Sequence, residues 1–141
     1  MSYSLSYSKS ILVVIFISDK IRQGQYDYLS TQNISEILNI PKPTLVKILQ
    51  SLTGAGIIET KEGKQGGIRL AKNPKEINLL HILNAIETNK GLFQTSYNIL
   101  AEGDRPNTAQ ESITNVFLAA ENQMKQVLCM KTIEDILIEM N

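Results

Sequence analysis

The stretch EGKQGGIRL, residues 62–70, combines three glycines with one lysine and one arginine in nine positions. Two kinds of chemistry use such a composition: a glycine-rich loop that cradles a phosphate, and a tight turn that presents cations to an external anion. A nucleotide-binding P-loop has a lysine followed by serine or threonine and leads into a helix. Because this stretch has neither feature, the sequence favours a turn whose charges face a partner.

Other residue types that could do chemistry are isolated. His81 has no cysteine, histidine or carboxylate at ligand spacing, so a surface or packing histidine is favoured over a metal ligand. Cys129 is the single cysteine, which excludes a disulfide within the chain. No paired carboxylates share a motif, so we expect neither an enzyme nor a resident cofactor.

Length and composition indicate one domain with a modest appendage. The 141 residues are 43% hydrophobic, enough to bury a core. The longest apolar run, residues 11–17, has seven residues, whereas a membrane span needs about 20. Without a basic leader and cleavage site at the N-terminus, the expectation is a soluble cytoplasmic protein.

The charge is unevenly distributed along the chain. Residues 1–75 hold ten Lys/Arg and five Asp/Glu, net +5, and residues 76–141 hold four and nine, net −5. The first half is therefore the candidate to bind a polyanion, the alternative being a chance segregation of charges over solvated faces.

Apolar spacing predicts helices, two of them forming a helix-turn-helix. The first helix covers residues 3–22. A short helix should begin after Ser30 or Thr31 as its cap and end at the turn 39–41. A second helix should begin near Pro43 and end at Gly54, which would act as a left-handed cap. The expected buried positions of these two helices are Ile34, Ile37 and Leu38, then Leu45, Ile48, Leu49 and Leu52. Asn78 is expected to cap a further helix that ends before Gly91.

A hairpin follows the helix-turn-helix. Residues 57–60 and 68–70 have strand composition and are separated by the glycine-rich, basic segment 61–67. Helix, turn, helix and hairpin in this order describe a winged helix, whose second helix enters the major groove while the hairpin reaches the flanking backbone or the minor groove.

The second helix would present polar residues outward. At 100° per residue, Pro43, Lys47 and Gln50 point away from the core, flanked by Thr44 and Val46. Such side chains can meet a guanine edge, an adenine edge or a thymine methyl, and Lys42 and Thr44 can reach phosphates. An ordinary solvated face remains the alternative.

The C-terminal part combines an irregular segment, residues 89–107, with a long helix from Thr108. The apolar face of this helix exceeds what one neighbour would cover, so we expect a subunit interface; the alternative is that the helix folds back on its own domain. The candidate interface residues are Ile113, Val116, Phe117, Ala120, Met124 and Val127. A capping box of Thr132 and Asp135 should start a last helix, residues 133–140.

Residues 34–87 resemble the Rrf-two family of bacterial winged-helix transcriptional regulators, which includes the iron–sulfur cluster regulator and nitric-oxide-sensing repressors. The resemblance extends to the first and the long helix. It lies in an Ile-Pro turn, a Leu-rich recognition helix, the approach to the wing, the glycine-rich wing and an Asn-Pro exit, found here at residues 40–41, 45–52, 55–58, 63–70 and 73–79.

The resemblance implies a homodimer that binds a palindromic operator, usually as a repressor. It implies DNA contacts from Lys42, Pro43, Thr44, Lys61, Lys64 and Arg69. Two departures stand out: Glu62 replaces an arginine that many relatives carry, and the three cysteines of cluster-binding members are missing between residues 88 and 112. The acidic Glu62 leaves more of the phosphate binding to Lys61 and Lys64, and a chain without thiolate ligands in this loop should hold no iron–sulfur cluster.

The prediction is thus a mainly α fold with a small β-hairpin: a winged helix-turn-helix with a long C-terminal dimerisation helix. We divide it into a DNA-binding domain (1–88), an irregular effector or connection loop (89–107), and the dimerisation and last helices (108–141). The expected partners are double-stranded DNA, a second copy, and an effector that the loop, through residues such as Phe93 or Tyr97, could hold. Alternative functions are a winged-helix protein-interaction module and a thiol-based regulator with Cys129 as redox sensor, although a buried structural cysteine is commoner.

Overall fold

The structure, a computed structural model, describes residues 5–88 and 91–141. Its elements in chain order are α1 (Leu5–Arg22), α2 (Thr31–Leu38), α3 (Lys42–Gly54), β1 (Ile58–Lys61), β2 (Gly67–Leu70), the 3-10 turn η1 (Pro74–Glu76), α4 (Leu79–Ile86), α5 (Asp104–Cys129) and α6 (Ile133–Glu139). The strands pair as one antiparallel hairpin. The predicted fold class, a winged helix-turn-helix with a long C-terminal helix, is confirmed.

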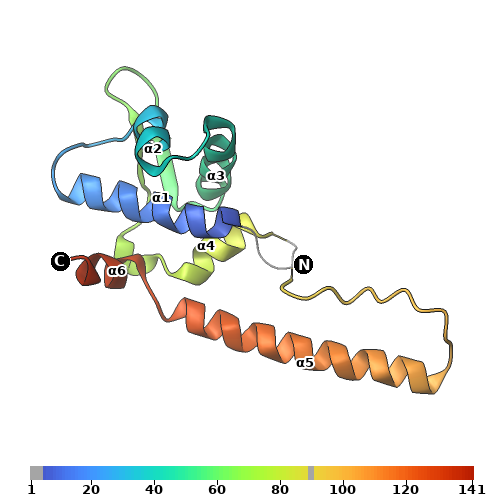
Figure 1. Cartoon of the computed structure of the whole chain (residues 1–141). Helices are drawn as coiled ribbons and strands as arrows, with labels where there is room; N and C mark the ends of the chain where they lie inside the picture. The colour runs from blue at the N-terminus through green and yellow to red at the C-terminus, as the bar shows by residue number, and fades with distance from the viewer. Residues whose placement is uncertain (1–4, 89–90) are drawn as a thin grey trace.

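Two parts are visible in Figure 1: a body and a projecting arm. Helices α1 to α4, α6 and the hairpin form the body, and α5 runs beneath it and extends well beyond it, with the chain from Gly91 to Gly103 leading out to the far end of α5. None of the helices described is long and apolar enough to cross a membrane.

The core lies between α1, α3, α4 and the strands. Val13, Val14 and Ile17 of α1 are fully buried, as the central apolar run predicts. The four buried positions predicted for α3 are confirmed. Ile37 is different: it is 59% exposed because α2 turns Ile34 into the core and packs Leu38 against it, which leaves Ile37 at the outer edge.

The end of α3 corrects one prediction. Gly54 is the last helical residue rather than a left-handed cap, and Gly56 takes the left-handed conformation with φ 74°. The N–H of Ile57 donates to the Leu52 carbonyl at 3.0 Å, and that of Gly56 donates to the Thr53 carbonyl at 3.0 Å. This is a Schellman motif, which needs the left-handed residue two positions later than we expected.

The start of α5 corrects another. The helix begins at Asp104, not at Thr108, directly after Gly103 with φ 111°. Pro106 fits in the first turn because no intrahelical donor is needed there, and Asp104 lies at the positive end of the helix dipole. Within the described residues the irregular segment therefore ends at Gly103.

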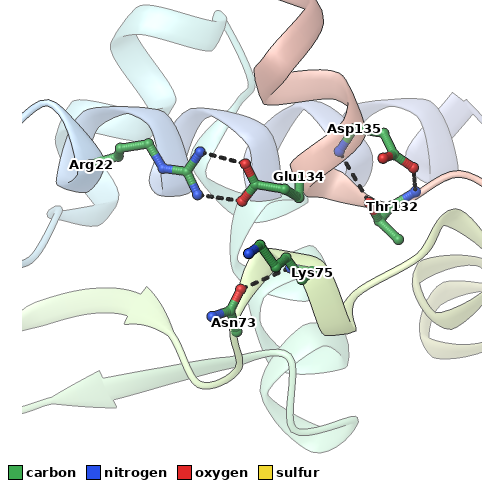
Figure 2. Close-up of polar contacts among 6 residues, drawn as sticks. All are labelled: Arg22, Asn73, Lys75, Thr132, Glu134 and Asp135. Carbon is green, nitrogen blue, oxygen red and sulfur yellow. Dashed lines mark hydrogen bonds and ion pairs between the residues drawn. The ribbon is translucent and has the colours of Figure 1, made fainter.

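The C-terminus returns to the body, where α6 packs on α1 and η1 (Figure 2). The predicted capping box is confirmed: Thr132 and Asp135 exchange side-chain-to-backbone hydrogen bonds of 2.9 and 3.0 Å. Arg22 at the end of α1 donates to the Glu134 carboxylate from both terminal guanidinium nitrogens, at 2.9 and 2.6 Å. Backbone bonds continue the contact, from Ile133 N–H to the Ile77 carbonyl at 2.8 Å and from Leu79 N–H to the Lys131 carbonyl at 3.0 Å.

This junction should make stability fall in acid. The hydrogen bond from Arg22 lowers the pKa of Glu134 below its ordinary 4.5. A depressed native pKa means that the unfolded chain binds more protons, so the stabilisation is present above pH 4.5 and is lost as the pH falls through the native pKa. We expect Glu134→Gln to flatten the acid dependence of the unfolding free energy, measured by urea titration between about pH 7 and about pH 3.5.

Arg22→Gln should flatten the curve equally, since it removes the cause of the shift. An unchanged acid dependence in both variants would contradict the assignment.

Candidate nucleic-acid interface

The outer face of α3 carries the predicted polar residues. Pro43, Lys47 and Gln50 are exposed, as their helical positions predict, and Thr44 is half-buried at the edge. Lys42 is the first helical residue and is also exposed. The N-cap residue Pro41 forms no side-chain capping bond, and a phosphate oxygen is well placed at the positive end of a helix dipole.

A groove separates this helix from the hairpin. Its volume is about 570 Å³, and its lining residues are Thr31, Val46, Leu49, Gln50, Thr53, Gly54, Thr60, Gly67 and Ile68. Val46 and Gln50 therefore face the groove from α3, while Thr60 and Gly67 face it from the strands. Helix α3 and the hairpin thus form two ridges with a mostly apolar floor between them.

The wing tip is a tight, exposed turn. Residues 61–65, which include Lys61, Glu62 and Lys64, are all exposed. The Gly66 N–H donates to the Gly63 carbonyl at 3.2 Å. A Cβ on Gly66 would lie 2.0 Å from the Lys61 carbonyl oxygen, so only glycine closes this turn. Among the residues that the structure describes, none forms an ion pair with Glu62.

The Arg69 side chain contacts two residues of its own chain, Glu59 and Tyr28. Its Nε is 2.5 Å from Oε1 of Glu59, its cross-strand partner, and this hydrogen bond raises the pKa of Arg69. The guanidinium carbon also lies 4.9 Å from the ring centre of Tyr28. Sequence reasoning missed Tyr28, because nothing in the apolar spacing places the loop before α2 beside the wing.

The proposed interface helix α5 leaves much of its apolar stripe uncovered. Glu121 is its only buried residue among those described. Val116 and Val127 are 64% and 67% exposed, Ile113 and Ala120 are also exposed, and Phe117 and Met124 are half-buried. The irregular segment covers one part: Phe93 stacks on Phe117 with ring centres 4.3 Å apart, and the Tyr97 and Thr114 hydroxyls lie 2.9 Å apart.

His81 and Cys129, the residues that the sequence shows without chemical partners, both lie at the surface. His81 is exposed and caps α4, where its Nδ1 accepts from the Asn78 N–H at 3.2 Å. Of the surface and packing settings expected for it, the structure shows the surface one. Cys129 ends α5 and is exposed, with its thiol 3.2 Å from the Gln126 carbonyl. The single chain thus leaves the Cys129 side chain exposed, unlike the buried setting that is commoner for a structural cysteine.

Comparison with known proteins decides the family. Residues 1–139 match the sequence pattern of the Rrf2 family, described as "Iron-dependent Transcriptional regulator". The chain belongs to the Rrf2 family. This confirms the resemblance to the Rrf-two family inferred from the helix-turn-helix and wing.

Members of the Rrf2 family with known names match in sequence and in structure. The HTH-type transcriptional regulator NsrR of Shouchella clausii is 36% identical over 72 residues, which cover 51% of this chain and 48% of that protein. The chain spans about half the length of the curated relatives it matches.

Solved structures share the fold. IscR of T. potens aligns with a TM-score of 0.67 at 18% identity, covering 100% of this chain and 89% of that one. CymR, the global cysteine regulator of B. subtilis, aligns with a TM-score of 0.69 at 20% identity, covering 96% and 95%.

The family description names iron. The residues of a single chain do not suit a thiolate-bound iron–sulfur cluster. Such clusters are held by several cysteine thiolates. This chain has one cysteine, and the described residues contain no group of three His, Cys, Asp or Glu side chains suited to a metal ion. In the loop from Gly91 to Gly103, the aromatic side chains of Phe93 and Tyr97 contact α5 instead.

Proposed function

We propose that this chain is a cytoplasmic, homodimeric transcriptional regulator that binds a palindromic DNA operator, as a repressor, without an iron–sulfur cluster. The observation that carries the proposal is that α3, which exposes Lys47 and Gln50, lies across a groove from the wing in an Rrf2 family member. Two ridges of this kind suit a major groove and its flanking backbone.

The DNA contacts divide by their chemistry. Lys47 and Gln50 lie on the outer face of α3, where they would meet base edges. Lys42, Pro43 and Thr44 surround the uncapped start of α3, where the helix dipole favours a phosphate. Lys61 and Lys64 on the wing would meet the flanking backbone, and they must offset the charge of Glu62 between them.

The dimer is supported by the apolar stripe on α5. Val116 and Val127 are about two-thirds exposed on an arm that projects from the body, and such a stripe is a common subunit interface. A two-fold dimer presents two recognition helices, which suits two symmetric half-sites.

Lys47→Ala and Lys64→Ala should each weaken operator binding by about tenfold and reduce the slope of log K against log salt by about 0.9 if the lysine neutralises one phosphate. A lysine that reads a base edge instead would lower affinity mainly for the specific sequence. Fluorescence anisotropy at several salt concentrations measures both quantities.

Lys131→Ala is the control, because it removes the same charge in the turn between α5 and α6, outside α3 and the wing. Wild-type binding in both test variants would refute the contact assignment.

Selection of bound duplexes from a random pool tests the function itself, with and without oxidant. A symmetric enriched sequence supports the proposal, and no enrichment favours the winged-helix protein-interaction module. A loss of enrichment in oxidant that Cys129→Ser prevents would identify Cys129 as a redox sensor, consistent with its exposure.

A further inference from the structure

The root of the wing is joined to the loop that precedes α2. The Leu29 N–H donates to the Ile68 carbonyl at 2.9 Å, and the Ile68 N–H donates to the Leu29 carbonyl at 2.7 Å. Leu29 thereby forms an antiparallel bridge with Ile68 and lies beside β2 like a one-residue third strand. The residue before it, Tyr28, is consequently held beside β2.

Gly67 allows the segment Tyr28–Leu29 to lie close against β2. In the hairpin, Lys61 pairs with Gly67 and Glu59 pairs with Arg69, and all four share one face because alternate strand residues do. Gly67 has φ 144°, and a Cβ there would lie 2.6 Å from the Leu29 carbonyl oxygen and 3.1 Å from the Tyr28 Cβ. The Leu29 carbonyl and the Tyr28 Cβ therefore lie against β2 at a position where only glycine fits.

Two cations of the same face contact this ring. The Arg69 guanidinium carbon and the Lys61 Nζ lie 4.9 and 5.5 Å from the Tyr28 ring centre, within the range of cation–π attraction. Arg69 is fixed from the other side by Glu59, at 2.5 Å. The ring thus contacts one cation from each strand, and one of these cations is tied across the hairpin.

We propose that Tyr28 is a positioning residue that fixes the wing relative to the helix-turn-helix, and that Arg69 acts on Tyr28 and Glu59 rather than on a DNA phosphate. The Tyr28 ring contacts the hairpin where Leu29 pairs with Ile68. The orientation of the hairpin at this point sets where Lys61 and Lys64 point. A wing held in place before binding loses less conformational entropy on the DNA. The effect on DNA affinity rests on the proposed function; the effect on the free wing does not.

The free wing is tested by NMR hydrogen exchange on the full chain without DNA. Tyr28→Phe keeps the ring and should leave the exchange of the Leu29 and Ile68 amides unchanged. Tyr28→Leu keeps apolar bulk but loses the π face, so these two amides should exchange about five- to thirtyfold faster, as expected for the loss of two cation–π contacts. Amides of α4 serve as the internal control. Equal exchange in wild type and Tyr28→Leu would overturn the proposal.

The role of Arg69 is tested by the salt dependence of DNA binding. Arg69→Gln should weaken binding through the wing while leaving the slope against log salt unchanged, whereas Lys64→Ala should reduce that slope by about 0.9. A slope reduced to the same extent by Arg69→Gln would make Arg69 a phosphate contact and overturn its assignment. If the wild-type chain binds no duplex, the proposed function fails, and the exchange rates alone decide the role of Tyr28.

Discussion

Val116→Asp is expected to convert the proposed dimer into monomers and to abolish tight operator binding. Val116 lies in the middle of α5 and is 64% exposed in the single chain. In a dimer built on α5 it would be desolvated, and an unpaired buried carboxylate costs several kcal/mol. Because the side chain is exposed in the monomer, the unfolding free energy of the monomer should barely change.

Sedimentation velocity at micromolar concentration gives the subunit state, and anisotropy with a two-half-site duplex gives the affinity. We expect the affinity to fall at least about a hundredfold, because each half-site must then be bound separately. Asn115→Asp is the matched control, since it adds the same charge to the adjacent exposed position, about 100° around the helix. A Val116→Asp protein that remains dimeric would place the interface elsewhere.

Gly66→Ala is expected to disrupt the wing. The added Cβ would lie 2.0 Å from the Lys61 carbonyl oxygen and 2.7 Å from its carbon, and both are backbone atoms that cannot move aside cheaply. Overpacking of this kind typically costs about 1–3 kcal/mol. We expect the hairpin amides to lose their exchange protection and the operator affinity to fall at least as far as in Lys64→Ala.

Gly54→Ala is the matched control for this substitution. Gly54 is the last residue of α3, and a Cβ there meets nothing within 4 Å. Alanine should be neutral or stabilising by up to about 1 kcal/mol, because it favours the helix. Loss of wing structure in Gly54→Ala but not in Gly66→Ala would contradict the steric account.

The sequence predicts the helix-turn-helix well because local rules determine it. Ser30 caps α2 and Asn78 caps α4, and both form the expected side-chain-to-backbone bonds. The apolar spacing of α3 predicts its buried face without exception. Such features depend on neighbours three or four residues apart, which a single sequence displays.

Contacts between distant segments are not predictable in this way. The ring of Tyr28 lies near Arg69, and Arg22 binds Glu134, although each pair is far apart in the chain. The cover that Phe93 gives Phe117 likewise depends on how the irregular segment folds along α5. The candidate DNA-binding lysines follow from helix geometry and turn composition, whereas the network that orients the wing follows only from the folded chain.

The backbone hydrogen bonds between residues 77–79 and 131–133 join the segment after the wing directly to the segment after α5. Ile77 and Leu79 follow the wing, while Lys131 and Ile133 follow α5, so the arm is fastened to the body where the wing exits. If the α5 helices of two chains pair, the position of α5 on the body then fixes the distance between the two α3 helices of the dimer. An operator for such a protein would tolerate changes in the sequence between its half-sites better than changes in their spacing.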